Sequence, residues 1–156
     1  YHTTESNDIC FLQGANNFMT IVKKVLVGKI VSKTGEILGE HRGLWFYTIG
    51  QRKGIGLSGG PYFVIDKDIK KNILVVSRDE KDLLKKEVKF KNANWISQQA
   101  KFPFKAKAKI RYGAQLANCL VYKDKAIFAK PQRAITPGQS VVFYKGNELL
   151  GGGIIA

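Results

Sequence analysis

The sequence predicts a mainly β protein of the α+β class, in which a small mixed central domain is followed by a C-terminal β-barrel. Three observations lead to this prediction. Short runs rich in β-branched and aromatic residues recur from residue 29 to the end of the chain, pairs of turn-forming residues separate many of them, and a helical spacing of apolar residues is clear only once, near the beginning. Short strands at such spacing are typical of a small barrel.

The elements before residue 78 form the mixed part. An amphipathic helix is predicted over residues 16–26, because two asparagines can cap a helix whose apolar residues then recur every three or four positions. Two hairpins are predicted next, one joining residues 29–31 to 36–38 and one joining residues 62–65 to 73–76.

The later part reads as strands separated by turns. The charged stretch of residues 78–91 is interpreted as a helical turn or a linker. Lys123-Asp124 and Gly146-Asn147 stand where hairpin turns are expected. The predicted strands cover residues 104–112, 119–122, 126–129, 140–144 and 148–150. We therefore divide the chain into a segment of residues 1–15, a central domain of residues 16–77 and a barrel of residues 78–156.

Charge points to the partner. The 156 residues carry 26 Lys and Arg against 12 Asp and Glu, a formal net charge of +14. The excess lies mainly after residue 60, where 19 basic side chains stand against 8 acidic ones, so the later part carries most of the positive field. A polyanion such as nucleic acid is the expected partner. A surface that is merely solvated by lysine is the alternative that charge alone leaves open.

The apolar runs and the cysteines indicate the cellular compartment in which the protein is expected. No apolar run approaches the roughly 20 residues that cross a bilayer, and the first residues lack the pattern of a signal peptide. We therefore expect a cytoplasmic protein with no membrane partner, in which two cysteines do not indicate a disulfide framework. Cys119 lies within a predicted strand and is interpreted as a small buried hydrophobic residue. The polar segment before Cys10 leaves open whether that thiol is reactive.

The run of residues 104–112 is the best physical indication of nucleic-acid binding. On a strand, every second side chain shares a face, so the intervening alanines and Ile110 face the core while four cations face solvent. These cations are Lys105, Lys107, Lys109 and Arg111. A phosphate backbone would relieve their mutual repulsion. The alternative is an edge strand that lysines protect from aggregation.

Residues 39–54 form the densest block of unusual residues, with four glycines, two arginines and three adjacent aromatics. We interpret this block as a surface that holds a ligand rather than as core packing. His41 is interpreted as structural, because no cysteine or carboxylate accompanies it at a fixed spacing, and no metal site is predicted. Arg52 and Lys53 lie on a loop bounded by glycines, where they either contact RNA or hold the central domain against another domain.

This block resembles, almost letter for letter, one in the bacterial tRNA-specific 2-thiouridylases, which exchange the 2-oxygen of the wobble uridine of tRNA for sulfur. Residues 134–144 and 149–155 resemble other segments of the same family. The resemblance implies that the chain is the central and C-terminal part of such an enzyme, with a barrel like those of translation factors. It also implies that ATP is bound by an N-terminal ATP-pyrophosphatase domain that this sequence lacks.

The resemblance assigns roles to particular residues. Arg111, Tyr112 and Gln139 match family positions that contact tRNA, which makes the anticodon region of tRNA the expected partner. Weaker candidates for tRNA binding are Arg52, Lys53, Lys107 and Lys109.

The resemblance also implies the sulfur chemistry. Cys10 matches the cysteine that accepts sulfur as a persulfide from a donor protein, although Asp8 stands where the family usually has glycine. The terminal sulfur on Cys10 would attack C2 of the uridine, and a second cysteine in the absent domain would resolve the intermediate through a disulfide.

Catalysis by the isolated chain is not expected. Ser58-Gly59-Gly60 is similar to the start of the ATP-pyrophosphatase loop, but Pro61 follows where that loop continues toward Asp and Ser, so the match is false. The alternative function is a non-catalytic RNA-binding β-barrel module. Cys10 and the block of residues 39–54 discriminate between the two, because a pure binding module has no use for them.

Overall fold

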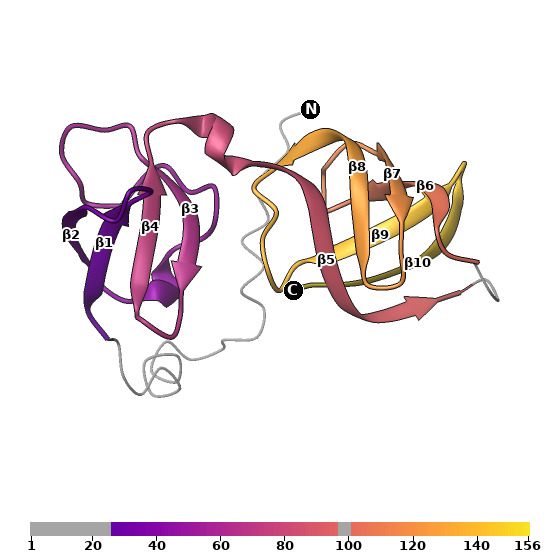
Figure 1. The fold of residues 1–156 in the computed structure, drawn as a ribbon, viewed down its shortest axis with the longest axis horizontal. Helices are drawn as coiled ribbons and strands as arrows, with labels where there is room; N and C mark the ends of the chain where they lie inside the picture. Colours follow the sequence, from indigo (N-terminus) through magenta and orange to yellow (C-terminus); the bar gives the residue numbers. More distant parts are fainter. Residues whose placement is uncertain (1–25, 97–100) are drawn as a thin grey trace, which may run out of the picture.

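The structure is a computed structural model that describes residues 26–96 and 101–156. The described residues form a small sheet and a closed barrel, which lie at opposite ends of the long axis (Figure 1). The sheet contains β1 (Gly28–Ser32), β2 (Ile37–His41), β3 (Phe63–Asp68) and β4 (Ile73–Ser77). The barrel contains β5 (Leu84–Trp95), β6 (Phe104–Lys109), β7 (Ala117–Val121), β8 (Lys125–Arg133), β9 (Ser140–Lys145) and β10 (Glu148–Ile155). The mainly β class with a C-terminal barrel is therefore confirmed.

The small sheet has the strand order β2-β1-β4-β3, with β1 and β4 parallel and the outer pairs antiparallel. Both predicted hairpins are present, as β1–β2 and β3–β4. The sheet packs one core, because alternate apolar residues turn inward from three of its strands. Ile30, Val64, Leu74 and Val76 are fully buried there. The predicted helix over residues 16–26 falls almost wholly outside the described residues.

The barrel closes in the order β10-β5-β8-β7-β6-β9. Its centre is filled by aromatic and branched side chains, which include Phe90, Phe128 and Phe143. Closure needs close backbone contact between β10 and its neighbours. A Cβ on Gly152 would lie 2.6 Å from the carbonyl oxygen of Val141, so a side chain there would displace a paired strand. Glycine at this position therefore permits the tight closure of the barrel.

The charged stretch of residues 78–91 is only in part what the sequence predicted. A 3-10 turn, η2 (Glu80–Leu83), begins it, and Asp79 caps that turn by accepting a hydrogen bond from the Lys81 N–H. The remainder is the first part of β5, which is neither helical nor a linker. Val88 and Phe90 are buried while the lysines between and around them are exposed. Because lysines are dense on the outer face, the sequence pattern does not reveal this segment as a strand with two-residue alternation.

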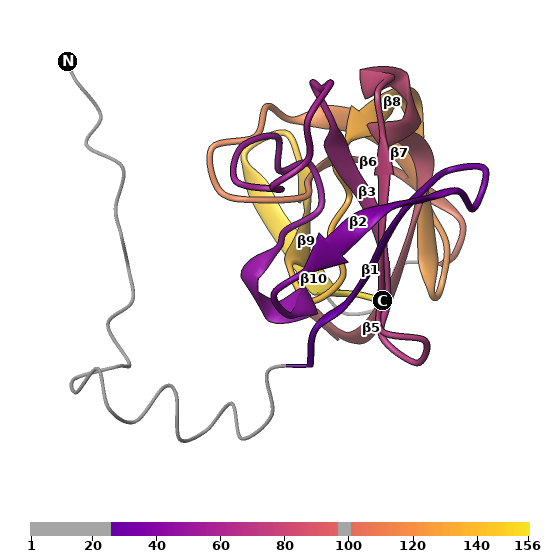
Figure 2. The same ribbon diagram turned by 90° about the vertical axis from the view of Figure 1, so that its left-hand side faces the viewer.

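The sheet and the barrel meet through a small apolar cluster. Its members are Ile49, Phe63, Leu83 and Ala134. Ile49 lies in the loop that follows a 3-10 turn, η1 (Leu44–Phe46), Phe63 lies in β3, Leu83 in η2, and Ala134 directly after β8. The Ala134 N–H donates to the carbonyl oxygen of Leu83, and Arg133 Nε lies 2.7 Å from Glu80 Oε1. Viewed from the sheet side, the four strands stand in front of the barrel (Figure 2). These contacts fix the segment before β3 beside the barrel.

Candidate nucleic-acid interface

The predicted alternation on β6 is present. Ala108 and Ile110 are buried, Lys105 and Lys107 are exposed, and Lys109 is half-buried. The strand ends at Lys109, so the predicted strand over residues 104–112 is three residues too long. Arg111 lies just beyond its end and is exposed. The inward alanines allow the neighbouring strands to approach, and the cations therefore share the outer face of the barrel.

The alternative interpretation of this run as a protected edge strand is wrong. β6 pairs antiparallel with β7 on one side and with β9 on the other, within a closed barrel. A strand with partners on both sides has no free edge for lysines to protect. The row of cations therefore needs another explanation.

Three residues expected to contact RNA leave the barrel at the same end. In the β6–β9 register Lys109 lies opposite Val142. Arg111 and Tyr112 follow Lys109, and Gln139 precedes Val142, so the antiparallel register carries all three beyond the same end of the pair. Tyr112 is fully exposed. The barrel thus brings Gln139 to the same end as Arg111 and Tyr112, which lie 27 or more positions away from it in sequence.

Gln139 lies in a hydrogen-bonded turn. Its N–H donates to the carbonyl oxygen of Thr136, and Gly138 within the turn has a φ of 88°. Its own carbonyl oxygen accepts a hydrogen bond from the Ile155 N–H. The backbone of Gln139 is therefore fixed, while its side chain is half-buried at the barrel end.

The loop with Arg52 and Lys53 is held beside the barrel by its backbone. Both side chains are exposed. The Gln51 side chain accepts a hydrogen bond from the Thr48 N–H and donates to the carbonyl oxygen of Lys53. Gly50 has a φ of 89°, and a Cβ there would lie 2.8 Å from the Ala134 Cβ, so this position requires glycine.

The interpretation of residues 39–54 as a ligand-holding surface rather than core packing is wrong for the residues of the block that are buried. His41, Leu44, Tyr47 and Ile49 are buried. Within the block, η1 (Leu44–Phe46) leaves Trp45 70% exposed. Part of the block therefore serves packing of the sheet, while Arg42, Phe46 and Arg52 are exposed as well as Trp45.

His41 is structural, as the sequence predicted. Its Nδ1 accepts a hydrogen bond from the Gly43 N–H at 3.0 Å, and its Nε2 lies 3.2 Å from the carbonyl oxygen of Asn72. This pattern assigns the neutral ring with the proton on Nε2. Both ring nitrogens are engaged with backbone groups, and Tyr47 packs edge-on against the ring at 5.9 Å. No nitrogen is left to act as a base.

Of the two cysteines, the structure describes only Cys119. Cys119 is buried on β7, and its Sγ donates to the carbonyl oxygen of Ala106 at 3.5 Å. Burial raises the pKa of the Cys119 thiol to about 11, so it stays protonated near neutral pH and is a poor nucleophile. The interpretation of Cys119 as a buried hydrophobic residue agrees with this. Cys10 and Asp8 lie outside the described residues.

Sequence reasoning missed two cations near Arg111. A hollow of about 670 Å³ lies between the segment after β6 and the end of β8, and Arg111, Lys130 and Arg133 line it together. Only the barrel brings these residues together, because they lie about 20 positions apart in sequence. Lys130 and Arg133 lie on the part of β8 beyond residue 129, where the predicted strand ended. A longer predicted strand would have included both cations.

No three His, Cys, Asp or Glu side chains gather in a way that could hold a metal ion in the described part of the chain. None of the helices formed by the described residues is long and apolar enough to cross a membrane.

Comparison with known proteins gives two family matches. Residues 16–78 match the family described as tRNA methyl transferase PRC-barrel domain. Residues 85–155 match the family described as aminomethyltransferase beta-barrel domain. The two matches follow one another, and together they span the small sheet and the barrel. They define a class of protein in which a PRC-barrel domain precedes a β-barrel.

Individual relatives narrow the class. The tRNA-specific 2-thiouridylase MnmA of Acetivibrio thermocellus is 41% identical over 97% of this chain and 45% of its own length. The proteins of the same name from Coxiella burnetii and Clostridioides difficile are 40% and 41% identical, over 97% and 99% of this chain and 46% of their own lengths. The chain belongs to the tRNA-specific 2-thiouridylase family. It spans about half the length of the curated relatives that it matches.

Proposed function

We propose that this chain is the tRNA-binding and sulfur-carrying part of an enzyme that thiolates C2 of the wobble uridine of tRNA. The observation that carries the proposal is the cation row of β6, which continues to Arg111 and Tyr112 at the barrel end where Gln139 also lies. Membership of the thiouridylase family supports tRNA as the polyanion.

The barrel end is suited to an RNA loop. The Arg111 guanidinium can hold two phosphate oxygens at once, and the exposed Tyr112 ring can stack on an unpaired base. Lys107 and Lys109 extend the positive surface along β6. We propose that these four residues and Gln139 contact the anticodon region.

The loop of the small sheet adds a second point of contact. Arg52 and Lys53 are exposed on a segment that Gly50 holds against Ala134 at the end of β8. A tRNA lying on the barrel end would therefore be near both units. We propose Arg52 and Lys53 as weaker phosphate contacts of the same tRNA.

The sulfur chemistry is proposed for Cys10. A persulfide on Cys10, received from a donor protein, would supply the sulfur that replaces the uridine 2-oxygen. ATP, which we propose is bound by a part of the enzyme outside this chain, would supply activation of that oxygen. A second cysteine outside the chain would resolve the intermediate through a disulfide. We accordingly propose that the isolated chain is inactive and that the enzyme works in the cytoplasm.

The proposed organisation follows these roles. Residues 1–15 carry the sulfur, residues 16–77 form the central domain, and residues 78–156 form the barrel. The contacts between η2, Ala134 and the loop near Ile49 support a fixed arrangement of the last two.

Thiolated-nucleoside analysis tests the proposal. In a full-length enzyme that contains this chain, Cys10→Ser should abolish 2-thiouridine formation with ATP and a persulfide donor, yet leave tRNA binding nearly intact, because a hydroxyl cannot carry transferable sulfur. Cys119→Ser is the matched control and should retain activity, since the buried thiol does not reach a substrate. Normal thiolation by the Cys10→Ser enzyme would refute the catalytic role and favour a non-catalytic RNA-binding barrel module.

A further inference from the structure

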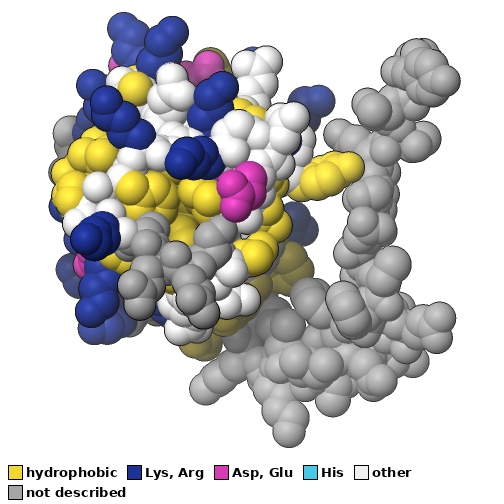
Figure 3. Space-filling model, turned by 90° about the vertical axis from the view of Figure 1, so that its right-hand side faces the viewer, with side chains coloured by type: hydrophobic (Ala, Val, Ile, Leu, Met, Phe, Trp, Pro, Cys, Tyr) yellow, Lys and Arg dark blue, Asp and Glu magenta, His cyan; other side chains and the backbone are white. Residues whose placement is uncertain are grey.

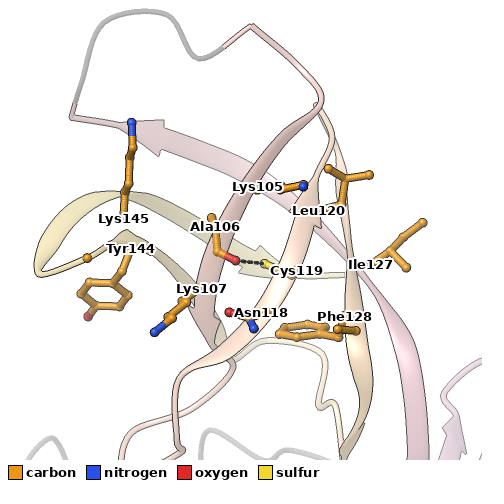
Figure 4. Close-up of a pocket in the computed structure, with 12 residues that line it drawn as sticks. Lys105, Ala106, Lys107, Asn118, Cys119, Leu120, Ile127, Phe128, Tyr144 and Lys145 are labelled. Carbon is orange, nitrogen blue, oxygen red and sulfur yellow. Dashed lines mark hydrogen bonds between the residues drawn. The ribbon is translucent and has the colours of Figure 1, made fainter.

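The outer face of the barrel contains a groove whose apolar floor has no part in the contacts proposed above. A hollow of about 640 Å³ crosses four neighbouring strands, β9, β6, β7 and β8 (Figure 4). Its floor is largely apolar, with Leu120 and Ile127 among the side chains that line it. Lys105, Lys107 and Tyr144 line its other side.

The strand register explains how this groove is built. One row of side chains across the strands consists of Ile127, Leu120 and Lys105. Leu120 on β7 lies opposite Ile127 on β8 and opposite Lys105 on β6. A second row places Lys107 opposite both Asn118 and Tyr144. Side chains opposite one another on antiparallel strands lie about 5 Å apart, so each row is in contact across the face. An aliphatic strip thus lies directly beside two lysines.

The electrostatics of the groove favour an anion. No acidic residue lines it among the residues that the structure describes. The ion pairs of the described residues are Lys33–Asp82, Lys125–Glu87 and Arg133–Glu80, and neither Lys105 nor Lys107 takes part in them. Lys145 also lines the groove but lies opposite the acidic Glu148 in the β9–β10 register.

The barrel side opposite the small sheet shows the same combination over a wider area. Hydrophobic side chains form a band across it, and Lys and Arg side chains lie mainly above the band and on its left, with an acidic side chain at its edge (Figure 3). An exposed apolar strip bordered by cations fits a ligand that is flat and apolar in one part and anionic in another.

The described side chains that line the groove are not arranged for catalysis. Cys119 borders it, but its Sγ is buried and donates to Ala106 (Figure 4). The raised pKa of that thiol keeps it protonated. None of the other lining side chains is a nucleophile that a neighbouring base activates, within the part of the chain that the structure describes.

We infer that this groove holds an unpaired nucleotide of RNA, with its base against Leu120 and Ile127 and its phosphates at Lys105 and Lys107. A duplex would present phosphates to the lysines but leave the aliphatic strip uncovered, whereas an unstacked base covers it. The inference rests on the proposed function for the choice of RNA as the polyanion. It adds a site on the barrel side to the contacts proposed at the barrel end.

The groove continues toward that end. Asn118 and Ala129 line both this groove and the hollow that contains Arg111 and Lys130. The cation row from Lys105 to Arg111 spans about 20 Å at the rise of an extended chain. A single RNA strand lying along β6 would therefore reach from the groove to Arg111.

Binding of short RNAs to the 156-residue chain tests the inference. Fluorescence anisotropy should be measured with a labelled hexauridylate and with a blunt RNA duplex of 12 base pairs. The double variant Leu120→Ser/Ile127→Ser changes no charge, and it should bind the hexamer about tenfold more weakly because base contacts are lost. Its affinity for the duplex should stay within about twofold of the parent, since phosphate contacts are kept.

A pair of lysine variants provides the charge control. Lys105→Ala/Lys107→Ala should weaken binding of both RNAs. The matched variant Lys89→Ala/Lys91→Ala removes the same charge from exposed positions on β5, outside the groove, and should weaken hexamer binding much less. Equal losses in the two lysine variants would overturn the inference, as would parental hexamer affinity in Leu120→Ser/Ile127→Ser.

Two further measurements need no substitution. A hexamer containing 4-thiouridine should crosslink to residues of the groove in the unaltered chain, and crosslinks that map only elsewhere would overturn the inference. Free uridine monophosphate should compete only at concentrations far above the hexamer affinity, and competition at similar concentrations would show a free-nucleotide pocket instead. The test of the groove can fail independently of the test of the proposed function. Thiolation by Cys10→Ser tests the proposed function, whereas hexamer binding by Leu120→Ser/Ile127→Ser tests the groove.

Discussion

Two segments that stand out in the sequence divide their side chains between core and surface in different ways. In residues 39–54, His41, Leu44, Tyr47 and Ile49 are buried, while both arginines, Trp45 and Phe46 are exposed. On β6, Phe104 and the alanines turn inward, and the cations remain on the outer face. The block thus mixes core and surface side chains without a regular period, whereas the alternation of β6 separates them by face.

The difference follows from what each segment must do locally. The block around His41 makes a 3-10 turn and several glycine turns with few backbone ladder hydrogen bonds, so side chains such as His41 and Gln51 supply partners for backbone groups. β6 obtains its backbone partners from β7 and β9 on both sides. Its outward side chains are therefore free to be selected for a ligand.

The largest effect on stability is expected from His41→Ala. The substitution leaves the Gly43 N–H and the Asn72 carbonyl oxygen without their partner and opens a cavity beside Tyr47. The free energy of unfolding should fall by about 3 kcal/mol, measured by urea denaturation. RNA affinity of the folded fraction should be unchanged. Trp45→Ala, on an exposed position of the same block, should cost much less, and equal losses in the two variants would contradict the structural role of His41.

The reverse pattern is expected on β6. Lys107→Ala/Lys109→Ala/Arg111→Ala should reduce affinity for tRNA and lower the slope of log K against log salt by about 2 to 3, at about 0.7 to 0.9 for each lost phosphate contact. Stability should hardly change, because exposed cations contribute little to it. The matched control is Lys85→Ala/Lys89→Ala/Lys91→Ala on β5, which removes the same charge. An unchanged slope in the β6 variant would remove this face from the tRNA site.

How far the sequence predicted the molecule depends on the kind of signal. The two hairpins of the sheet and the alternation of β6 were predictable, because they rest on local period and turn chemistry. No part of β5 was predicted, since Val88 and Phe90, its two buried residues, are outnumbered by the surrounding lysines. A short alternation is easily hidden when the outer face is uniformly charged.

The candidate site was predictable only in part for a different reason. Arg111, Tyr112 and Gln139 came from resemblance, and their common place at one barrel end depends on the β6–β9 register. The groove of Leu120 and Ile127 depends on pairing across β6, β7 and β8. Pairing between distant strands is a tertiary property that no local pattern encodes, so the sequence could not show it.

A smaller effect is expected at Cys119, inside the barrel wall. Cys119→Ser should lower the free energy of unfolding by about 1 kcal/mol, the low end of the cost of burying a hydroxyl, because the carbonyl oxygen of Ala106 remains available as an acceptor. The pH dependence should also change. The folded-state pKa of the thiol, about 11, lies above its ordinary value of 9.0, so the parent should lose stability as pH rises through that window. The serine variant should lack that component of the loss in chemical denaturation between pH 8 and 11. Identical pH profiles for the two proteins would contradict the burial of a neutral thiol.

The smallest effect is expected at Asp82, where the small sheet is joined to the segment leading into the barrel. Asp82 accepts a hydrogen bond from Ser77 Oγ at 2.6 Å and pairs with Lys33 from the β1–β2 turn. The hydrogen bond from Lys33, followed by that from Ser77, lowers the pKa of the Asp82 carboxyl below its ordinary value of 3.8. A lowered pKa stabilises the fold above that ordinary value, and the stabilisation is lost as pH falls through the folded-state pKa.

Asp82→Asn should therefore lower Tm slightly at pH 7 and leave it unchanged near pH 2, measured by thermal denaturation. Because Lys33→Ala removes the same contact from the other side, the double variant should be no less stable at pH 7 than Asp82→Asn alone. A Tm difference between Asp82→Asn and the parent that is the same at both pH values would show that the carboxylate charge does not hold this junction.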